Sequence, residues 1–305
     1  MTRIACIGEC MIELSQVDLA SGQARIGFAG DTLNTAVYLA RLGGPGTTVS
    51  YLTTLGTDAF STRMIDGFQA EGIDTALIGR DPDRLPGLYA IETDATGERS
   101  FRYWRDTAAA RRLFTGPGPT LNDLAQFDVI YLSGITLAIL PPDMRQALTG
   151  RLGQLRAAGH RIVFDPNHRP RLWPDDASAR AAFDAAWRAT TLALPSFDDE
   201  ERLHPGTTPA QVLARIAAFG VPEIVLKNGA SGPLIGFDGA VTQTHLPRAA
   251  RVIDTSGAGD SFNAGYLAAR LAGANPATAA AAGHRLASTV IGHHGAVIPR
   301  SAMPI

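Results

Sequence analysis

A glycine-rich segment near the carboxyl end of the chain has the residue types needed to handle a phosphate. Residues 252–263 read Val-Ile-Asp-Thr-Ser-Gly-Ala-Gly-Asp-Ser-Phe-Asn, which predicts a strand end, a glycine loop and the start of a helix. The N–H groups of a first helical turn carry partial positive charge, and glycine lets an anion approach the backbone closely. We therefore expect Gly257, Ala258 and Gly259 to stabilise the negative charge that develops on a transferring phosphate.

An acidic residue follows this loop directly. Asp260 would lie in the first helical turn, where a carboxylate can take a proton from a hydroxyl nucleophile and accelerate its attack roughly 10²–10⁴-fold. The position also suits an acid that only complements the helix dipole, so two interpretations stay open here. The segment is not a P-loop, because it has no Gly-Lys-Ser/Thr, and it lacks the third glycine of a dinucleotide fingerprint.

A second glycine–acid pair begins residues 30–43, which read Gly-Asp-Thr-Leu-Asn-Thr-Ala-Val-Tyr-Leu-Ala-Arg-Leu-Gly. This pattern predicts a helix with Asp31 as N-cap and Gly43 as its stop. Asn34 lies in the first turn and away from the apolar stripe, so its amide can face a ligand. An ordinary capped helix is the alternative.

Two arginines predict a site for a carboxylate. Arg105 follows Tyr103 at alternating positions of a strand-like run, with Tyr89 on the run before it, and Arg169 comes just after the end of another strand. Ligands of open α/β sheets bind at the carboxyl ends of the strands, and charged hydrogen bonds contribute about 1.5–3 kcal/mol each. A solvated edge charge and a sheet aromatic are the structural alternatives for Arg105 and Tyr103.

A third polar loop could receive a nucleotide. Residues 226–233 read Leu-Lys-Asn-Gly-Ala-Ser-Gly-Pro, a strand end followed by a glycine turn. Lys227 could reach nucleotide phosphates, and Gly229 permits a close backbone approach. A tight turn with a solvated lysine remains the alternative.

The elements that must position these residues alternate along the chain. Apolar, β-branched runs predict strands at 4–8, 48–53, 128–133, 161–165, 191–194 and 223–227. Amphipathic patterns predict helices at 32–42, 59–71, 142–158, 178–188, 209–219, 261–272 and 276–291. Apolar strands that alternate with helices indicate an α/β fold with a mostly parallel central sheet covered on both faces.

Two segments interrupt this alternation. Residues 11–29 and 84–107 resemble hairpins, the second with a turn at 93–97, and Phe101, Tyr103 and Arg105 should share one face of a strand. These hairpins would form a small separate sheet, either a lid over the site or an edge for dimer formation.

Composition excludes several classes of protein. The 305 residues include 27 Lys and Arg against 29 Asp and Glu, a net charge of −2 that disfavours a nucleic-acid binder. The length fits two domains or one large α/β domain. The two cysteines, Cys6 and Cys10, cannot form a disulfide framework, and no secretory signal or membrane-length apolar run occurs. We expect a soluble cytoplasmic protein.

The motifs together resemble a known family. Asp254-Thr255-x-Gly-Ala-Gly-Asp is similar to the C-terminal motif of the ribokinase-like (PfkB) carbohydrate kinases, and residues 30–43 are similar to their N-terminal motif. The resemblance runs from Ile4 to Pro299 and implies one ribokinase-like catalytic domain over residues 1–305 with a lid from about 11–29 and 84–107. It also implies the following roles: an anion hole at Gly257, Ala258 and Gly259, a base at Asp260, and sugar contacts at Gly30, Asp31 and Asn34.

Within that family, residues 8–14, 85–89, 101–105 and 169–173 resemble the 2-keto-3-deoxygluconate (KDG) kinases. This resemblance implies that Tyr89, Tyr103, Arg105 and Arg169 bind the carboxylate and keto end of an acid sugar. Asp260 would then activate the terminal 6-hydroxyl, giving 2-keto-3-deoxy-6-phosphogluconate and ADP. The galactonate epimer, fructose and ribose are the alternative substrates.

The resemblance also implies the cofactors. ATP would bind along the Lys-x-Gly-Ala-x-Gly loop, which holds Lys227, Gly229 and Gly232, together with Asn167 and the glycine loop at 257–259, with adenine against Gly283, Ala287 and residues 291–295. Mg²⁺ is expected because transfer between anions needs charge neutralisation, and a monovalent cation is a further option. Relatives carry Asn-x-x-Glu for Mg²⁺, whereas residues 196–200 here read Ser-Phe-Asp-Asp-Glu. The hairpin lid predicts a homo-oligomer.

Two other classes of function compete with a kinase. A catalytically silent sugar-acid or nucleotide sensor could use the same scaffold, although the complete glycine loop and Asp260 argue against it. A dinucleotide-dependent oxidoreductase would share the β/α alternation, but it needs an early Gly-x-Gly-x-x-Gly that this chain lacks.

Overall fold

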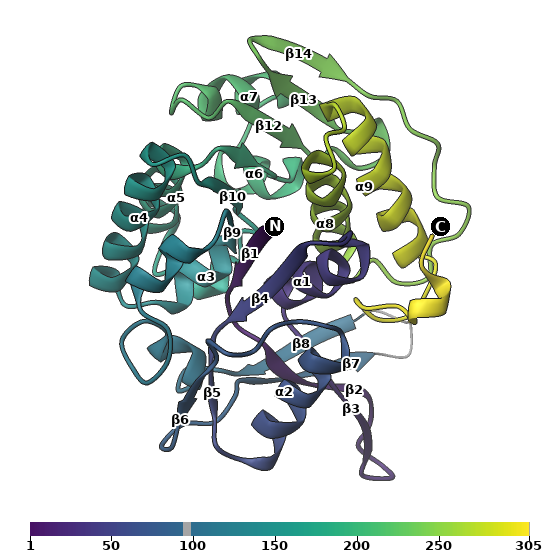
Figure 1. The fold of residues 1–305 in the computed structure, drawn as a ribbon. Helices are drawn as coiled ribbons and strands as arrows, with labels where there is room; N and C mark the ends of the chain where they lie inside the picture. Colours follow the sequence, from purple (N-terminus) through teal and green to yellow (C-terminus); the bar gives the residue numbers. More distant parts are fainter. Residues whose placement is uncertain (94–98, 305) are drawn as a thin grey trace.

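The main sheet of the protein is mixed but mostly parallel. The computed structural model describes residues 1–93 and 99–304, and its largest sheet has the strand order β14-β13-β12-β11-β10-β9-β1-β4 (Figure 1). All neighbours pair in parallel except β12 with β13 and β13 with β14. The strands are β1 Thr2–Ile7, β4 Thr47–Leu52, β9 Val129–Ser133, β10 Arg161–Asp165, β11 Leu192–Ala193, β12 Glu223–Leu226, β13 Leu234–Phe237 and β14 Ala240–Gln243.

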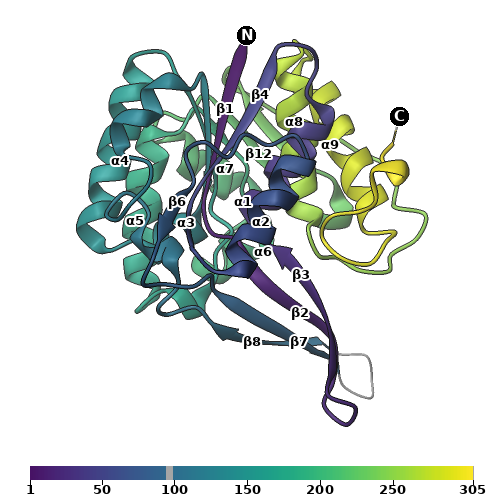
Figure 2. The ribbon, with the colours of Figure 1, turned by 60° about the horizontal axis from the view of Figure 1, so that its bottom comes forward.

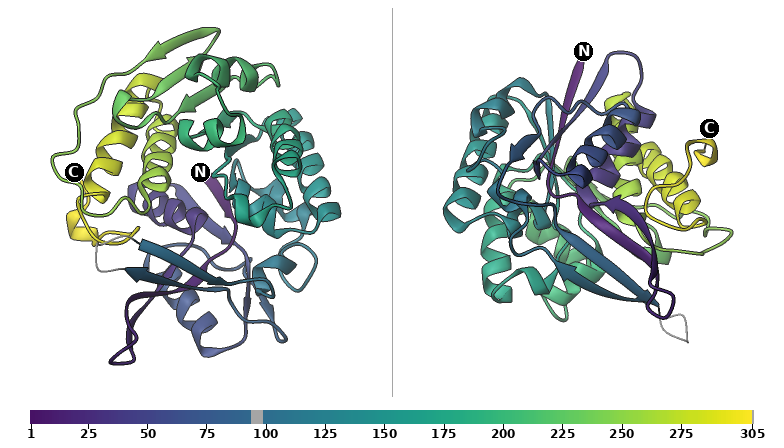
Figure 3. Two further views of the ribbon diagram at one scale, coloured as in Figure 1. Left: turned by 180° about the vertical axis from the view of Figure 1, so that it is seen from behind. Right: turned by 90° about the horizontal axis from the view of Figure 1, so that it is seen from below.

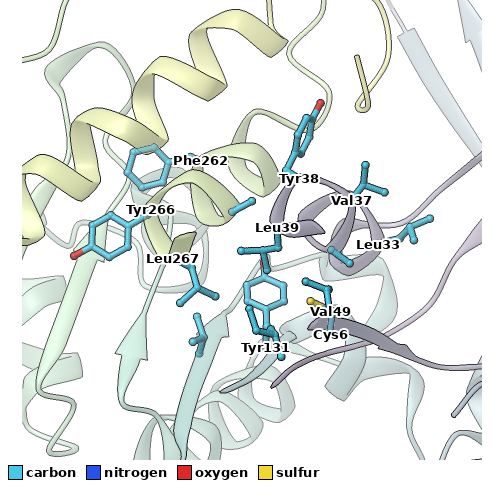
Figure 4. Packing of buried hydrophobic residues seen from close by; sticks show 14 of the residues in the cluster. Cys6, Leu33, Val37, Tyr38, Leu39, Val49, Tyr131, Phe262, Tyr266 and Leu267 are labelled. Atoms are coloured by element: carbon cyan, nitrogen blue, oxygen red, sulfur yellow. The ribbon is translucent and has the colours of Figure 1, made fainter. Parts of the chain in front are cut away.

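Helices cover both faces of this sheet (Figures 1 and 3). One face carries α1 Asp31–Leu42, α2 Ala59–Ala70, α8 Ala258–Leu271 and α9 Pro276–Val290. The other carries α3 Gly134–Ile139, α4 Pro142–Ala157, α5 Asp176–Ala189, α6 Phe197–Leu203 and α7 Pro209–Ala217. Alternate residues of β1 point to the two faces, because side chains alternate along a strand: Ile4 and Cys6 join the first core (Figure 4), and Ala5 and Ile7 join the second.

A second sheet projects from the edge of the body (Figure 2), and we call it the lid sheet. Its strand order is β3-β2-β7-β8, formed by β2 Met11–Asp18, β3 Gln23–Ala29, β7 Leu88–Thr93 and β8 Arg99–Trp104. Each hairpin is antiparallel, and the two hairpins join through the parallel pair β2 and β7. The small second sheet is confirmed, while part of the turn predicted at 93–97 lies outside the described residues.

The structure corrects several sequence expectations. The N-cap of α1 is Gly30, not Asp31, which is the first helical residue. Residues 252–253 are not in a strand, because the backbone N–H of Ile253 donates instead to the carbonyl of Ile291 in the loop after α9. The antiparallel pair β13–β14, the short helices α3 and α6, and the small sheet of β5 Thr54–Gly56 and β6 Gly79–Asp81 were missed.

No helix within residues 1–93 and 99–304 combines the length and the apolar character needed to cross a bilayer.

Candidate active site

A cavity of about 1740 Å³ lies at the carboxyl ends of the main sheet's strands, with the lid sheet as one wall. Sixteen residues selected from the sequence as site residues line this cavity, whereas Gly283, expected beside the adenine, does not. They are Gly30, Asp31, Asn34, Tyr89, Tyr103, Arg105, Asn167, Arg169, Lys227, Gly229, Gly232, Gly257, Ala258, Gly259, Asp260 and Ala287. Segments up to 257 residues apart in the chain therefore meet around one space, as expected for an open α/β sheet.

The glycine loop at the start of α8 has the backbone conformation that its sequence suggests. Gly257 is the N-cap, in the left-handed region at φ 71°, and a Cβ there would come within 2.7 Å of the carbonyl oxygen of Ala296. Gly259 leaves room for the head of Lys227, whose Nζ would lie 3.5 Å from an added Cβ. Gly257, Ala258 and Gly259 line the cavity at the start of α8, where the backbone N–H of Ala258 donates to the carbonyl of Thr255 at 3.3 Å. A glycine-rich helix start beside a cavity suits an anion.

Asp260 lies in the first turn of α8 and is held from α1. Its carboxylate accepts a 2.8 Å hydrogen bond from the side-chain amide of Asn34, and its carbonyl accepts one of 3.2 Å from the hydroxyl of Thr35. Burial, and next the charge of Asp31, raises the pKa of Asp260 to about 7. A carboxylate with this pKa can accept a proton near neutral pH, which is the requirement for a general base.

Lys227 belongs to a buried polar cluster beside the glycine loop. The Nζ of Lys227 donates to Asp165 at 2.7 Å and to Asn263 at 3.1 Å, and the side-chain amide of Asn263 donates to Asp165 at 2.6 Å. The interpretation of Lys227 as a solvated lysine is wrong, since its side chain is only 14% exposed. The ammonium group neutralises a carboxylate at the cavity floor while it remains close to the glycine loop.

Asp31 and Asn167 connect two of the loops around the cavity. The Asn167 side-chain amide donates to the carboxylate of Asp31 at 2.8 Å, and its backbone N–H donates to Asp165 at 3.0 Å. Asn167 has a φ of 33°, a strained value outside glycine that often marks a functional loop. The pair holds the loop after β10 against the start of α1.

The lid sheet contributes an aromatic face to the cavity. The ring of Tyr89 lies 5.8 Å from that of Tyr103 and 6.3 Å from that of Phe101. The hydroxyl of Tyr89 donates to the carboxylate of Glu13 on β2. Burial raises the pKa of the Tyr89 hydroxyl. Tyr103 is 44% exposed, so its ring is accessible to a ligand.

The two arginines line the same cavity but differ in their surroundings. Arg105 comes directly after β8, its guanidinium carbon lies 5.8 Å from the ring centre of Tyr103, and it forms a buried ion pair with Glu9. Its interpretation as a solvated edge charge is therefore wrong. The side chain of Arg169 is half-exposed, and its guanidinium lies 3.7 Å from the carboxylate of Asp199. Both can present N–H donors to a carboxylate in the cavity.

The side expected to hold the nucleotide is formed by two turns and α9. Gly229 and Gly232 lie in the turn after β12, both with positive φ, and Ala287 faces the cavity from α9. Gly283 does not line it: the residue packs against α8, where a Cβ would come within 2.6 Å of the carbonyl of Phe262. Side chains of residues 246–249 also line this side.

The acidic residues after β11 have the carboxylate oxygens that serve as ligands of a nucleotide-bound Mg²⁺. Ser196 is the N-cap of α6 and accepts from the backbone N–H of Asp199, while Asp198 and Asp199 line the cavity. Across residues 1–93 and 99–304 no cluster of three or more His, Cys, Asp or Glu side chains could hold a metal alone. Mg²⁺ that arrives on phosphates needs only one or two carboxylates. Asp198 and Asp199 both lie at the cavity, and Asp199 is also 3.7 and 3.5 Å from the guanidinium groups of Arg169 and Arg202.

Sequence reasoning missed four residues that support the site: Glu9, Glu13, Asp165 and Asn263. Asp165 ends a parallel strand, and this position alone could have identified it. Glu9 and Glu13 lie in the stretch 8–14 that resembles the KDG kinases, but their roles and that of Asn263 depend on partners 96, 76 and 98 residues away in the chain.

Comparisons with known proteins agree with this geometry. Residues 1–303 match the model of the pfkB family carbohydrate kinases. The chain is 47% identical to a 2-dehydro-3-deoxygluconokinase of Escherichia coli (strain K12), over 99% of both chains, and 48% identical to one of Dickeya dadantii (strain 3937), over 99% of this chain and 98% of the relative. A candidate ribokinase II of E. coli, solved in complex with ATP and Mg²⁺, aligns with a TM-score of 0.84 at 22% identity, covering 100% of this chain and 96% of that one.

The fold and the cavity define an ATP-dependent sugar kinase of the ribokinase-like fold. The chain belongs to the pfkB family of carbohydrate kinases. Its relatives at 47–48% identity, matched almost end to end, are 2-dehydro-3-deoxygluconokinases. The family and the fold expected from the sequence are confirmed.

Proposed function

We propose that this protein transfers the γ-phosphate of ATP to the terminal 6-hydroxyl of 2-dehydro-3-deoxygluconate, the compound also named KDG. The products are 2-keto-3-deoxy-6-phosphogluconate and ADP. One observation carries the proposal: the carboxylate of Asp260, beside the glycine loop of α8, lines the same cavity as Arg105 and Arg169. A neutral sugar has no group that needs two guanidinium groups, whereas KDG has a carboxylate.

Each residue then has a physical role. Arg105, Arg169, Tyr89 and Tyr103 hold the carboxylate and keto end of KDG, while Gly30, Asp31 and Asn34 contact its hydroxyls. Asp260 takes the proton from the 6-hydroxyl as its oxygen attacks the γ-phosphorus and the bond to the β-phosphate oxygen breaks. The backbone N–H groups of Gly257, Ala258 and Gly259 stabilise the developing negative charge.

The nucleotide would occupy the side of the cavity formed by Asn167, Lys227, Gly229, Gly232 and Ala287. Mg²⁺ bound with ATP would supply neutralisation of the phosphate charge, and Asp199 is the carboxylate that would hold it. Lys227 contributes positive charge below the glycine loop, although Asp165 engages its ammonium directly. A monovalent cation is an optional further cofactor.

The remaining features fit a single catalytic domain over residues 1–305 with the lid sheet as its cover. Closure of the lid would exclude water and limit wasteful ATP hydrolysis. The edge strands β3 and β8 would offer pairing surfaces for a homo-oligomer. Cys6 and Cys10 are both free and buried, which fits a reducing cytoplasm.

ADP release with MgATP tests the proposal, with KDG, its galactonate epimer, fructose, ribose and no sugar compared in parallel. We expect strong turnover with KDG and background rates with fructose and ribose. Turnover with a neutral sugar and none with KDG would contradict the assignment of the substrate. Equal rates with KDG and its epimer would widen the assignment to both acid sugars.

A further inference from the structure

A buried ion pair lies at the root of the lid sheet, where the chain enters and leaves it. Glu9 precedes β2, Gly87 precedes β7 and Arg105 follows β8. The Glu9 carboxylate accepts from the guanidinium of Arg105, and its Oε1 would lie 2.9 Å from a Cβ placed on Gly87. The pair thus links the end of β1, in the main sheet, to the last strand of the lid sheet.

The pair is almost completely buried yet incompletely bonded. Glu9 is 2% exposed and Arg105 is 8% exposed. Within the described residues, Oε1 of Glu9 and Nε of Arg105 have no hydrogen-bond partner. Burial raises the pKa of Glu9, and the charge of Arg105 opposes the shift. The Nε atom is itself shielded from solvent, but Arg105 lines the cavity, so its side chain still borders the substrate space.

Stability alone does not account for such a pair, because burying two charges costs about as much as their attraction returns. A second buried ion pair in this chain lies away from the cavity and serves as a comparison. Glu223 on β12 holds two guanidinium nitrogens of Arg270 at 2.7 and 2.9 Å, and neither residue lines the cavity. The Glu9–Arg105 pair, by contrast, borders the cavity through Arg105 and leaves Nε of Arg105 without a hydrogen-bond partner within the described residues.

We propose that Glu9 is a positioning residue for acid-sugar recognition: it holds the Arg105 guanidinium against the end of the main sheet, so that its remaining N–H donors face the substrate carboxylate. This inference rests on the proposed function. Arg105 directly follows the last strand of the lid sheet, but Glu9 holds its side chain against the main sheet. Movement of the lid sheet would therefore not displace the guanidinium.

The role of Glu9 depends on its partner. While Arg105 is present, Glu9 accepts from the guanidinium and orients it. Once Arg105 is removed, nothing opposes the burial that raises the pKa of Glu9, so the uncharged carboxyl is favoured and has no partner left to position. A residue that only supports the fold would act in the same way with and without Arg105.

A double-mutant cycle tests the proposal with Glu9→Asp, Glu9→Gln and Arg105→Ala. Glu9→Asp keeps the charge but shortens its reach, so we expect the KM for KDG to rise about tenfold while the KM for ATP stays within about twofold. Glu9→Gln keeps the shape and one acceptor, and its KM for KDG should stay within about threefold of the unmodified chain. In the Arg105→Ala background, neither Glu9→Asp nor Glu9→Gln should change the KM for KDG further.

Glu223→Asp is the matched control, because it shortens a buried carboxylate of an ion pair away from the cavity. It should lower Tm and leave both KM values unchanged. Equal rises in both KM values for Glu9→Asp, an unchanged KM for KDG, or the same Glu9→Asp effect with and without Arg105 would each overturn the positioning role. Failure of the proposed function is distinguishable, since it would appear as absent KDG turnover in the unmodified chain.

Discussion

The side-chain amide of Asn34 on α1 donates a 2.8 Å hydrogen bond to the carboxylate of Asp260 on α8, across 226 residues of sequence. The bond joins the two motifs that contain the glycine–acid pairs. It favours the ionised form of Asp260, against the burial that raises the carboxyl's pKa to about 7. The helix that carries the expected sugar contacts therefore also sets the protonation of the expected base.

Asn34→Ala should move the pH dependence of the reaction. The ascending limb of kcat/KM in the unmodified protein should lie near pH 7, because the base must be ionised to act. Loss of a hydrogen bond to the ionised form, about 1 kcal/mol, should move that limb up by roughly 0.7 pH unit. Thr35→Val is the control: Thr35 donates to the carbonyl of Asp260, not the carboxylate, so its limb should stay in place. A limb that does not move in Asn34→Ala would contradict the account.

Asp260→Asn should stabilise the fold at high pH. The carboxyl's pKa is raised from 3.8 to about 7, so between these values the folded state holds more protons than the unfolded state. The free energy of unfolding therefore falls as pH rises through this window. The variant should melt about 2–6 °C above the unmodified chain at pH 8, with the difference vanishing near pH 4. The N-cap Asp175 has a lowered pKa, so Asp175→Asn should give the opposite sign.

Gly257→Ala should strain the glycine loop and lower kcat. The substitution places a Cβ at φ 71°, where strain costs about 1–2 kcal/mol, and pushes it toward the carbonyl of Ala296. Displaced N–H donors should lower kcat by about 10²–10³. Gly239→Ala, at φ 75° with open space around it, is the matched control and should cost stability without changing kcat. Equal kcat values for Gly257→Ala and Gly239→Ala would contradict the role of the glycine loop as an anion hole.

Arg169→Ala should weaken binding of the acid sugar selectively. A half-exposed guanidinium that binds a carboxylate contributes toward the lower end of about 1.5–3 kcal/mol, so the KM for KDG should rise about tenfold. The KM for ATP should stay within about twofold. Arg188→Ala removes an arginine of α5 outside the cavity and should change neither KM. A rise in the KM for ATP as large as that for KDG would argue against the carboxylate contact.

The order of elements and most of the site could be predicted from sequence, for local reasons. The apolar alternation predicted the parallel core around β1, β9 and β10, and the glycine loop predicted the start of α8 within three residues. Asp260 was recognisable because its place in the first helical turn depends only on its neighbours.

The partners of these residues were not predictable, because they are set by tertiary contacts. Nothing near Arg105 in the chain indicates Glu9, and Lys227 meets Asp165 only when β10 and β12 are placed two strands apart in one sheet. The N-cap of α1 was misassigned for a related reason. The Asp31 carboxylate accepts from Asn167 across the cavity, so it does not fold back on its own helix.

The turnover of Asp260→Asn with KDG and MgATP tests the central claim most directly. Asparagine keeps the shape of the side chain but cannot accept the proton, so kcat should fall about 10²–10⁴-fold while the Kd for KDG stays within about threefold. Full turnover in this variant, in folded protein that binds KDG normally, would contradict the role of Asp260 as the base.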